Sequence, residues 1–149
     1  MAEIVHKVGV IGLGIMGRRM ITNMVPPPRF EITGAWDPNP QARTDAATET
    51  PGLAIMEDAD AVIADADLVY IATPPLYHRD YADRAMAAEK AVYCEKPLGV
   101  DIEDSRALVA ALEDNWTPNV VNFIQASSRA VTLTKERIDS GALGDIIGV

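Results

Sequence analysis

A glycine-rich turn near the amino terminus has the residue types and spacing of a phosphate-binding loop. Gly12-Leu13-Gly14-Ile15-Met16-Gly17 fits the pattern G-x-G-x-x-G and lies between an apolar run, residues 7–11, and a segment of helical period. In such a turn the first glycine permits the sharp bend, the second lets a pyrophosphate approach the backbone, and the third allows close packing of helix on strand. The free N–H groups at the helix start then face the phosphate charge. The turn predicts a dinucleotide site, and the alternative is a glycine-rich turn that serves packing alone.

An acidic residue stands at the position that recognises the ribose of such a cofactor. Asp37 lies twenty residues after Gly17, at the end of a second apolar run, residues 30–36. A carboxylate there can accept hydrogen bonds from both adenosine ribose hydroxyls, and it repels a 2′-phosphate. We therefore predict NAD in preference to NADP, although Arg43 could reach a 2′-phosphate if the loop bends toward it. A second role of Asp37, as the N-cap of the next helix, is compatible with the first.

The elements around these residues alternate between short β-branched runs and longer segments of helical period. This alternation predicts an α/β fold with a doubly wound parallel sheet of the Rossmann type. The expected strands are residues 7–11, 30–36, 53–56, 68–73, 91–94 and 120–124, and the expected helices are 15–25, 40–48, 76–88, 101–114 and 130–139.

Several details of these helices can be predicted from spacing and from capping residues. Prolines 26–28 should stop the first helix, Asp101 should cap the helix that follows it, and Gly141 should end the last one. The acidic segment 57–67 is interpreted as a solvated helical face capped by Asp58 and Asp65. Two sets of apolar side chains are expected to face the core: Tyr77, Tyr81, Ala85 and Ala88 in one helix, and Leu108, Val109 and Leu112 in another.

Composition limits the classes of function. The 149 residues make one ordinary domain, and 22 acidic against 13 basic side chains argue against a nucleic-acid or anionic membrane surface. The longest uncharged apolar stretches, 8–17 and 68–76, reach about half of the ~20 residues that span a bilayer. Cys94 is the single cysteine and is expected as a buried packing thiol. Glu3, His6 and Lys7 do not form a basic region that leads into an apolar segment, so we expect a cytoplasmic protein. The two histidines, His6 and His78, have no neighbour at metal-ligand spacing, so we predict no metal site.

Three further motifs make the sequence similar to a known family. Ala72-Thr73-Pro74-Pro75, then His78, then Cys94-Glu95-Lys96-Pro97-Leu98-Gly99 resemble the signatures of the Gfo/Idh/MocA oxidoreductases, the relatives of glucose-fructose oxidoreductase and inositol dehydrogenase. The resemblance runs over residues 7–147. It implies a Rossmann domain followed by a second α/β domain with an open sheet, and hydride transfer between a nicotinamide cofactor and a sugar or polyol carbon. It also implies a homo-oligomer formed through that second domain.

The resemblance assigns roles at the ends of two strands. Lys96 lies where a strand ends at the ligand-binding edge of an open sheet, and its ammonium could polarise a substrate oxygen and stabilise negative charge as an alcohol loses its proton. Glu95 could hold that ammonium or touch the nicotinamide ribose, and the alternative for both is a solvated ion pair. His78 either anchors the preceding loop or faces the cofactor, and a cis peptide bond is expected before Pro97.

Lys96 is thus the candidate catalytic residue, and it also belongs to the candidate cofactor-binding set. That set consists of Gly12, Leu13, Gly14, Ile15, Met16, Gly17, Asp37, Ala72, Thr73, Pro74, His78, Glu95 and Lys96.

Departures from the family pattern suggest that this chain is a portion of a longer enzyme. The resemblance places an Asp-x-x-x-His pattern in the second domain, beyond the equivalent of Val149, and no histidine follows His78. We expect a dinucleotide-binding domain over residues 1–123, followed over 124–149 by the junction and first elements of a truncated second domain. Asn122-Phe123-Ile124-Gln125 stands where many members have Asn-Tyr-Arg, and Glu89 replaces a common turn glycine.

Two other classes of function share some of these features. One is a non-catalytic module that senses NAD in regulation or as a scaffold, and the other is an S-adenosylmethionine methyltransferase. Gly17 and the Glu-Lys-Pro signature argue against the methyltransferase.

Overall fold

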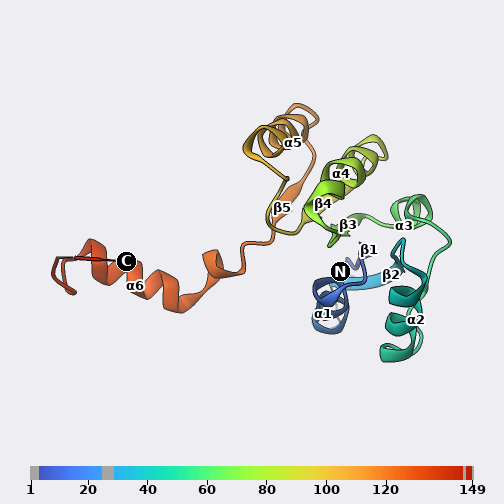
Figure 1. Ribbon diagram of the computed structural model, residues 1–149, viewed down its shortest axis with the longest axis horizontal. Coiled ribbons are helices and arrows are strands. Elements are labelled where there is room, and N and C mark those ends of the chain that lie inside the picture. Colours follow the sequence, from blue (N-terminus) through green and yellow to red (C-terminus); the bar gives the residue numbers. More distant parts are fainter. Residues whose placement is uncertain (1–3, 25–28, 146, 149) are drawn as a thin grey trace.

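A five-stranded parallel sheet forms the centre of the computed structural model, which describes residues 4–24, 29–145 and 147–148 (Figure 1). The strand order is β2-β1-β3-β4-β5. The strands are β1 (His6–Ile11), β2 (Phe30–Trp36), β3 (Leu68–Ile71), β4 (Ala91–Cys94) and β5 (Asn119–Val121). The α-helices are α1 (Ile15–Met24), α2 (Pro40–Glu49), α3 (Ala59–Asp65), α4 (His78–Ala87), α5 (Ile102–Asp114) and α6 (Arg129–Asp139), and two short 3₁₀ helices are η1 (Pro75–Tyr77) and η2 (Ile124–Ser127). The predicted doubly wound α/β fold is confirmed.

The register of the sheet brings the ends of three strands to one edge. Ile11 at the end of β1 pairs with Trp36 of β2 on one side and with Ile71 of β3 on the other. The chain order reverses at β1, because β2 and β3 lie on opposite sides of it. Open α/β sheets bind ligands at the carboxyl ends of the strands at such a switch point.

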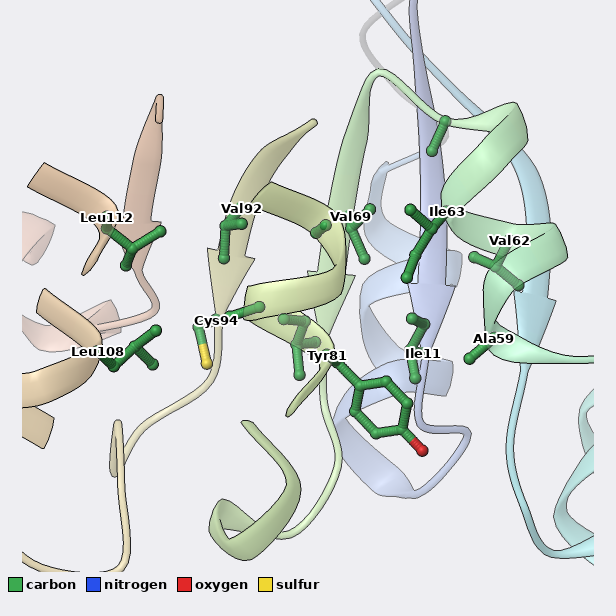
Figure 2. Close-up of a cluster of buried hydrophobic side chains, with 14 residues drawn as sticks. Ile11, Ala59, Val62, Ile63, Val69, Tyr81, Val92, Cys94, Leu108 and Leu112 are labelled. Atoms are coloured by element: carbon green, nitrogen blue, oxygen red, sulfur yellow. The ribbon is translucent and has the colours of Figure 1, made fainter. Parts of the chain in front are cut away.

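Helices cover both faces of the sheet around β1 and β3, which explains why the buried residues of these strands form continuous apolar runs. One core cluster joins Ile11, Val69 and Val92 to α3, α4 and α5, and Figure 2 shows the side chains that these helices contribute. A second cluster on the other face joins Val10 and Tyr70 to Ile21 of α1 and Ala46 of α2.

Helix starts follow the capping residues. The Asp101 side chain accepts a hydrogen bond from the Asp104 amide and caps α5, and Asp58 caps α3 through the Ala61 amide, both as predicted. The prediction for Asp65 is wrong: it is the last residue of α3, and its carboxylate forms an ion pair with Lys7 at the start of the sheet.

Three predicted strands are shorter than expected or absent. β3 ends at Ile71, two residues before the predicted end at Thr73. Residues 53–56 do not form a strand, because Ile55 makes only an isolated bridge with Ala35. β5 ends at Val121, where the Phe123 amide donates back to the Val121 carbonyl and turns the chain into η2.

The aromatic stripe predicted for residues 76–88 is only partly correct. The α-helix begins at His78, after the 3₁₀ turn η1, and its buried side chains are His78, Tyr81, Ala82 and Ala85. Tyr77 and Ala88 are exposed. In α5, Leu108 and Leu112 are buried as predicted, whereas Val109 is exposed.

The last helix differs from the others. α6 extends away from the sheet (Figure 1), none of its residues is buried, and Gly141 follows its end with a φ of +73°. The predicted end of the first helix at residue 25, the three prolines after it, and the residues 146 and 149 of an apolar C-terminal run lie outside the described residues. Among the described helices, none has the length and apolar character needed to cross a membrane.

Candidate cofactor site

A cavity of about 640 Å³ opens at the carboxyl edge of the sheet, beside the switch point. This volume is within the range of small-molecule and cofactor sites. It is lined by Gly14, Ile15, Met16, Asp37, Pro38, Asn39, Ala42, Ala72, Thr73, Pro74, Tyr77 and Tyr81. The glycine-rich turn, Asp37 and the segment after β3, which sequence reasoning assigned to one site, are therefore brought together.

The three glycines of the turn have different surroundings. Gly12 has a φ of +101°, and a Cβ there would lie 2.6 Å from the Ala72 carbonyl oxygen. A Cβ at Gly17 would lie 1.8 Å from the Gly12 carbonyl oxygen, so this position allows α1 to start close against the turn. Gly14, by contrast, lines the cavity and has no atom within 4 Å of where a Cβ would stand. The first and third glycines thus shape the loop, and the second leaves room for a ligand at its backbone.

The start of α1 is suited to bind an anion. The first N–H groups of a helix have no acceptor within it, and in α1 they belong to Ile15, Met16 and Gly17. Ile15 and Met16 line the cavity. The positive end of the helix dipole lies at the same place.

The Asp37 carboxylate is held in place by two backbone amides. Its Oδ2 accepts a hydrogen bond from the Leu13 amide at 2.8 Å, and its Oδ1 accepts one from the Asn39 amide at 2.8 Å. The carboxylate therefore links the glycine-rich turn to the loop after β2. The N-cap of α2 is Asn39, which accepts from the Gln41 amide, so the expectation that Asp37 caps this helix is wrong.

Arg43 is the cation nearest in sequence to this carboxylate. It lies in α2, and its guanidinium donates a hydrogen bond to the backbone carbonyl of Asp37. Arg43 thus contacts the main chain of Asp37 and helps to fix the conformation of the loop after β2.

His78 anchors the segment that forms another wall of the cavity. Its side chain is 1% exposed, and its Nε2 lies 2.7 Å from the Thr73 carbonyl oxygen. Ala72, Thr73 and Pro74 line the cavity, but His78 does not. Of the two roles predicted for His78, the structure supports the anchoring one, because burial keeps the ring away from the cavity.

Lys96 and Glu95 follow β4 at the same edge of the sheet, and their side chains have different environments. Lys96 is exposed, and the peptide bond between it and Pro97 is cis, as predicted. Glu95 is 4% exposed, and its contact with Lys96 is to the backbone amide, at 3.2 Å. Of the two roles predicted for Glu95, a contact with the ammonium is not observed, and a contact with the nicotinamide ribose stays a prediction. The side chain before them, Cys94, is buried as predicted, and burial raises the pKa of its thiol to about 12.

Two aromatic side chains that line the cavity were not predicted there from the sequence. Tyr77 and Tyr81 line it, although their spacing was interpreted as a core stripe. Their position directly after Pro74 and Pro75, at the carboxyl end of β3, is the signal that could have placed them there. Within the described residues, no three side chains of the metal-binding types come together.

Comparison with known proteins identifies the relatives of this chain. The model of an oxidoreductase family with an NAD-binding Rossmann fold matches residues 6–123. Inositol 2-dehydrogenase from Rhodococcus erythropolis is 35% identical over 146 residues, which cover 93% of this chain and 41% of that protein. A dTDP-3,4-didehydro-2,6-dideoxy-alpha-D-glucose 3-reductase from Streptomyces violaceoruber is 32% identical over 143 residues, or 94% of this chain and 42% of the relative.

A solved structure agrees with these matches. Scyllo-inositol dehydrogenase from Lactobacillus casei, determined with bound cofactor NAD(H) and scyllo-inositol, superposes with a TM-score of 0.82 at 27% identity, over 95% of this chain and 43% of that one. This chain spans about two fifths of the length of the relatives it matches.

Proposed function

Because this chain belongs to the Gfo/Idh/MocA oxidoreductase family, whose NAD-binding Rossmann fold matches residues 6–123, we propose that the whole protein transfers a hydride between a nicotinamide cofactor and a carbon of a sugar or polyol. The observation that carries the proposal is the cavity in which the glycine-rich turn and Asp37 meet. The family match gives no support to the alternatives of a regulatory NAD sensor or a methyltransferase.

The residues around the cavity fit a dinucleotide. The open space at Gly14 lets a phosphate reach the backbone, and the amides at the start of α1 offer hydrogen-bond donors to it. Asp37 would accept hydrogen bonds from the adenosine ribose. Thr73 lines the cavity, and its hydroxyl has no hydrogen-bond partner within the part of the chain that the structure describes, so it is a candidate donor or acceptor for the cofactor. When bound, the nicotinamide supplies the acceptor or donor of the hydride.

We infer a preference for NAD over NADP. A 2′-phosphate at the adenosine ribose would bring negative charge against the Asp37 carboxylate, which two amides hold at the cavity. The nearby cation that could offset this repulsion is Arg43, and its guanidinium contacts the Asp37 carbonyl.

Lys96 is the proposed catalytic group of this chain. β3 and β4 pair so that Ile71 lies beside Cys94, and Thr73 and Lys96 each follow two residues later. The ammonium is exposed at this edge, where it can donate a hydrogen bond to a substrate oxygen and stabilise the negative charge that develops there. The names of the relatives support a cyclic polyol or a sugar as the substrate class.

We also propose two units in the sequence, residues 1–123 for the cofactor and 124–149 as the junction to a further domain. α6 leaves Val131, Leu133 and Ile138 exposed, as expected of a helix that packs against further structure. That domain would supply the remaining catalytic groups and the contacts of a homo-oligomer. The single cysteine agrees with a reducing, cytoplasmic location, where disulfide bonds are rare.

Calorimetric titration with NAD and NADP tests the cofactor assignment. We expect NAD to bind more tightly than NADP, and Asp37→Ala to weaken NAD about tenfold or more, because the ribose hydroxyls lose a charged acceptor worth roughly 1.5–3 kcal/mol.

Asp45→Ala is the matched control. It also replaces one aspartate by alanine, but Asp45 lies in α2 and does not line the cavity. Equal NAD affinity of the Asp37→Ala and Asp45→Ala variants would refute the assignment of Asp37.

A further inference from the structure

A buried polar network lies beneath the carboxyl ends of β3, β4 and β5. The Tyr70 hydroxyl donates to Glu95 Oε1 at 2.6 Å, and the Asn122 side-chain amide donates to the same oxygen. The Tyr93 hydroxyl donates to Asn122 Oδ1 at 3.0 Å. Glu95 and Asn122 are almost fully buried, and Tyr70 is fully so.

The network is embedded in the core on the side of the sheet that α1 covers. Tyr70 belongs to the cluster that contains Val10 and Ile21, and Tyr93 packs against that cluster. The two tyrosine rings meet edge to face with centroids 5.1 Å apart. A carboxylate in such surroundings is costly unless hydrogen-bond donors replace its water.

Donors from three strand ends supply that replacement. They are the Tyr70 hydroxyl, the Asn122 amide and the backbone amide of Lys96. Burial and the neighbouring carboxylate raise the pKa of Tyr70, so its hydroxyl keeps its proton and remains a donor. The arrangement leaves the carboxylate satisfied within the protein and turned away from solvent.

The same carboxylate is attached to the segment that carries Lys96. Glu95 Oε2 accepts a hydrogen bond from the Lys96 backbone amide. In addition, the backbone amide of Glu95 donates to the Ile71 carbonyl, and the backbone amide of Asn122 donates to the Cys94 carbonyl. Backbone hydrogen bonds thus join the segment around Glu95 to β3 and to the residue after β5. The Glu95 side chain adds a separate link from the Lys96 amide to Tyr70 and Asn122.

We propose that Tyr70 and Asn122 are positioning residues: they hold the Glu95 carboxylate in the core, and this carboxylate holds the backbone of Lys96 beside the Ala72–Pro74 wall of the cofactor cavity. The catalytic consequence rests on the proposed function of Lys96. Neither residue touches the cavity. Their effect on the reaction passes entirely through Glu95.

Amide hydrogen exchange in Tyr70→Phe tests the structural part. The change keeps the ring and removes one donor to the carboxylate, so we expect the Lys96 amide to exchange at least tenfold faster, while Val69 and Val92 amides exchange as in the unaltered protein. Tyr93→Phe is the matched control, because it removes a hydroxyl from the neighbouring ring and leaves every direct donor to Glu95 in place.

Steady-state kinetics of the full-length protein test the catalytic part. We expect Tyr70→Phe to lower kcat at least tenfold with an unchanged KM for NAD. Tyr93→Phe removes a hydrogen bond to Asn122 and none to Glu95, so we expect it to lower kcat less. If Tyr70→Phe does not fold, Asn122→Ala tests the same carboxylate from β5.

If the Lys96 amide exchanges at the same rate in Tyr70→Phe as in Tyr93→Phe, the positioning role of Tyr70 is overturned. Faster exchange with an unchanged kcat would overturn its catalytic consequence. An unaltered protein that reduces no NAD with any sugar or polyol would count against the proposed function, and the exchange measurement would still decide whether the network positions Lys96.

Discussion

At the scale of single residues, the cavity is organised by backbone groups that are fixed before a ligand arrives. The Asp37 carboxylate is oriented by the Leu13 and Asn39 amides, and the loop after β3 is anchored by His78. A site that is already ordered loses less conformational entropy when a ligand binds. The amides that orient Asp37 and the ring of His78 that anchors the loop should thus favour cofactor binding even where they do not contact the cofactor.

Gly14 and Gly17 are expected to respond differently to the same added methyl group. Gly17→Ala should destabilise the fold by about 3 kcal/mol or more, because the methyl would overlap the Gly12 carbonyl oxygen. Gly14→Ala should change stability by no more than about 0.5 kcal/mol but weaken NAD binding, since its methyl enters open space at the cavity. Urea unfolding and calorimetric titration measure the two effects.

The pair provides its own control, since each variant adds one methyl within the same turn. A Gly14→Ala protein that binds NAD as tightly as the unaltered one would show that the phosphates do not approach this part of the backbone.

Lys96 should matter for turnover and little for folding. In the full-length protein, Lys96→Met should lower kcat by about 10²–10⁴, the range for loss of a group that transfers a proton or stabilises developing charge. Because the ammonium is exposed, the unfolding midpoint should stay nearly the same. Steady-state kinetics with NAD and a polyol panel measure the effect.

Lys90→Met removes the same charge from the opposite end of β4, where Lys90 contacts the Ala64 carbonyl, and serves as the control. Equal turnover of the two variants would remove Lys96 from the mechanism.

At the scale of elements, α4 and α5 end in the same way, with a left-handed residue that is not glycine. Glu89 has a φ of +58° and Trp116 a φ of +53°. After each, the next amide bonds back into the helix, from Lys90 to Ala85 and from Thr117 to Leu112. This is the hydrogen-bond pattern in which glycine is preferred after a helix, because a Cβ is unfavourable in the left-handed region.

Glycine at these two helix ends should therefore stabilise the protein. Trp116→Gly should raise the free energy of unfolding by about 0.5–1 kcal/mol, since the relieved strain exceeds the added entropy of the unfolded chain. The indole is 91% exposed, so little packing is lost. Urea unfolding monitored by circular dichroism measures the change.

Trp116→Ala separates the two contributions, because it removes the indole and keeps the Cβ. If the alanine variant were as stable as the glycine variant, strain in the left-handed region would not be the cause.

At the scale of the whole molecule, the sheet and α6 have different relations to the core. Helices cover both faces of the sheet around β1 and β3, whereas α6 contributes no buried residue. Parallel strands need cover on both faces, and a helix with an exposed apolar side needs a partner. The matched relatives are more than twice as long as this chain, which agrees with a proposed further domain beside α6.

Much of the fold and of the cofactor site could be predicted from the sequence, because these features depend on local chemistry. The pattern of glycines, the β-branched runs and the caps at Asp58 and Asp101 act within a few residues. Strands 30–36 and 91–94 accordingly have the predicted bounds. The predicted meeting of Asp37 with the glycine-rich turn also follows from local order, since both come directly after neighbouring strands.

The partner of several polar side chains depends on how distant strands and helices pack. Glu95 is 25 residues from Tyr70 and 27 from Asn122, and strand register alone brings these three side chains into contact. The same holds for Asp65 with Lys7, and for Tyr77 and Tyr81 at the cavity. Residue type and spacing along the chain specify what a side chain can do, but the packing of distant strands and helices determines which groups it meets and whether water can reach it.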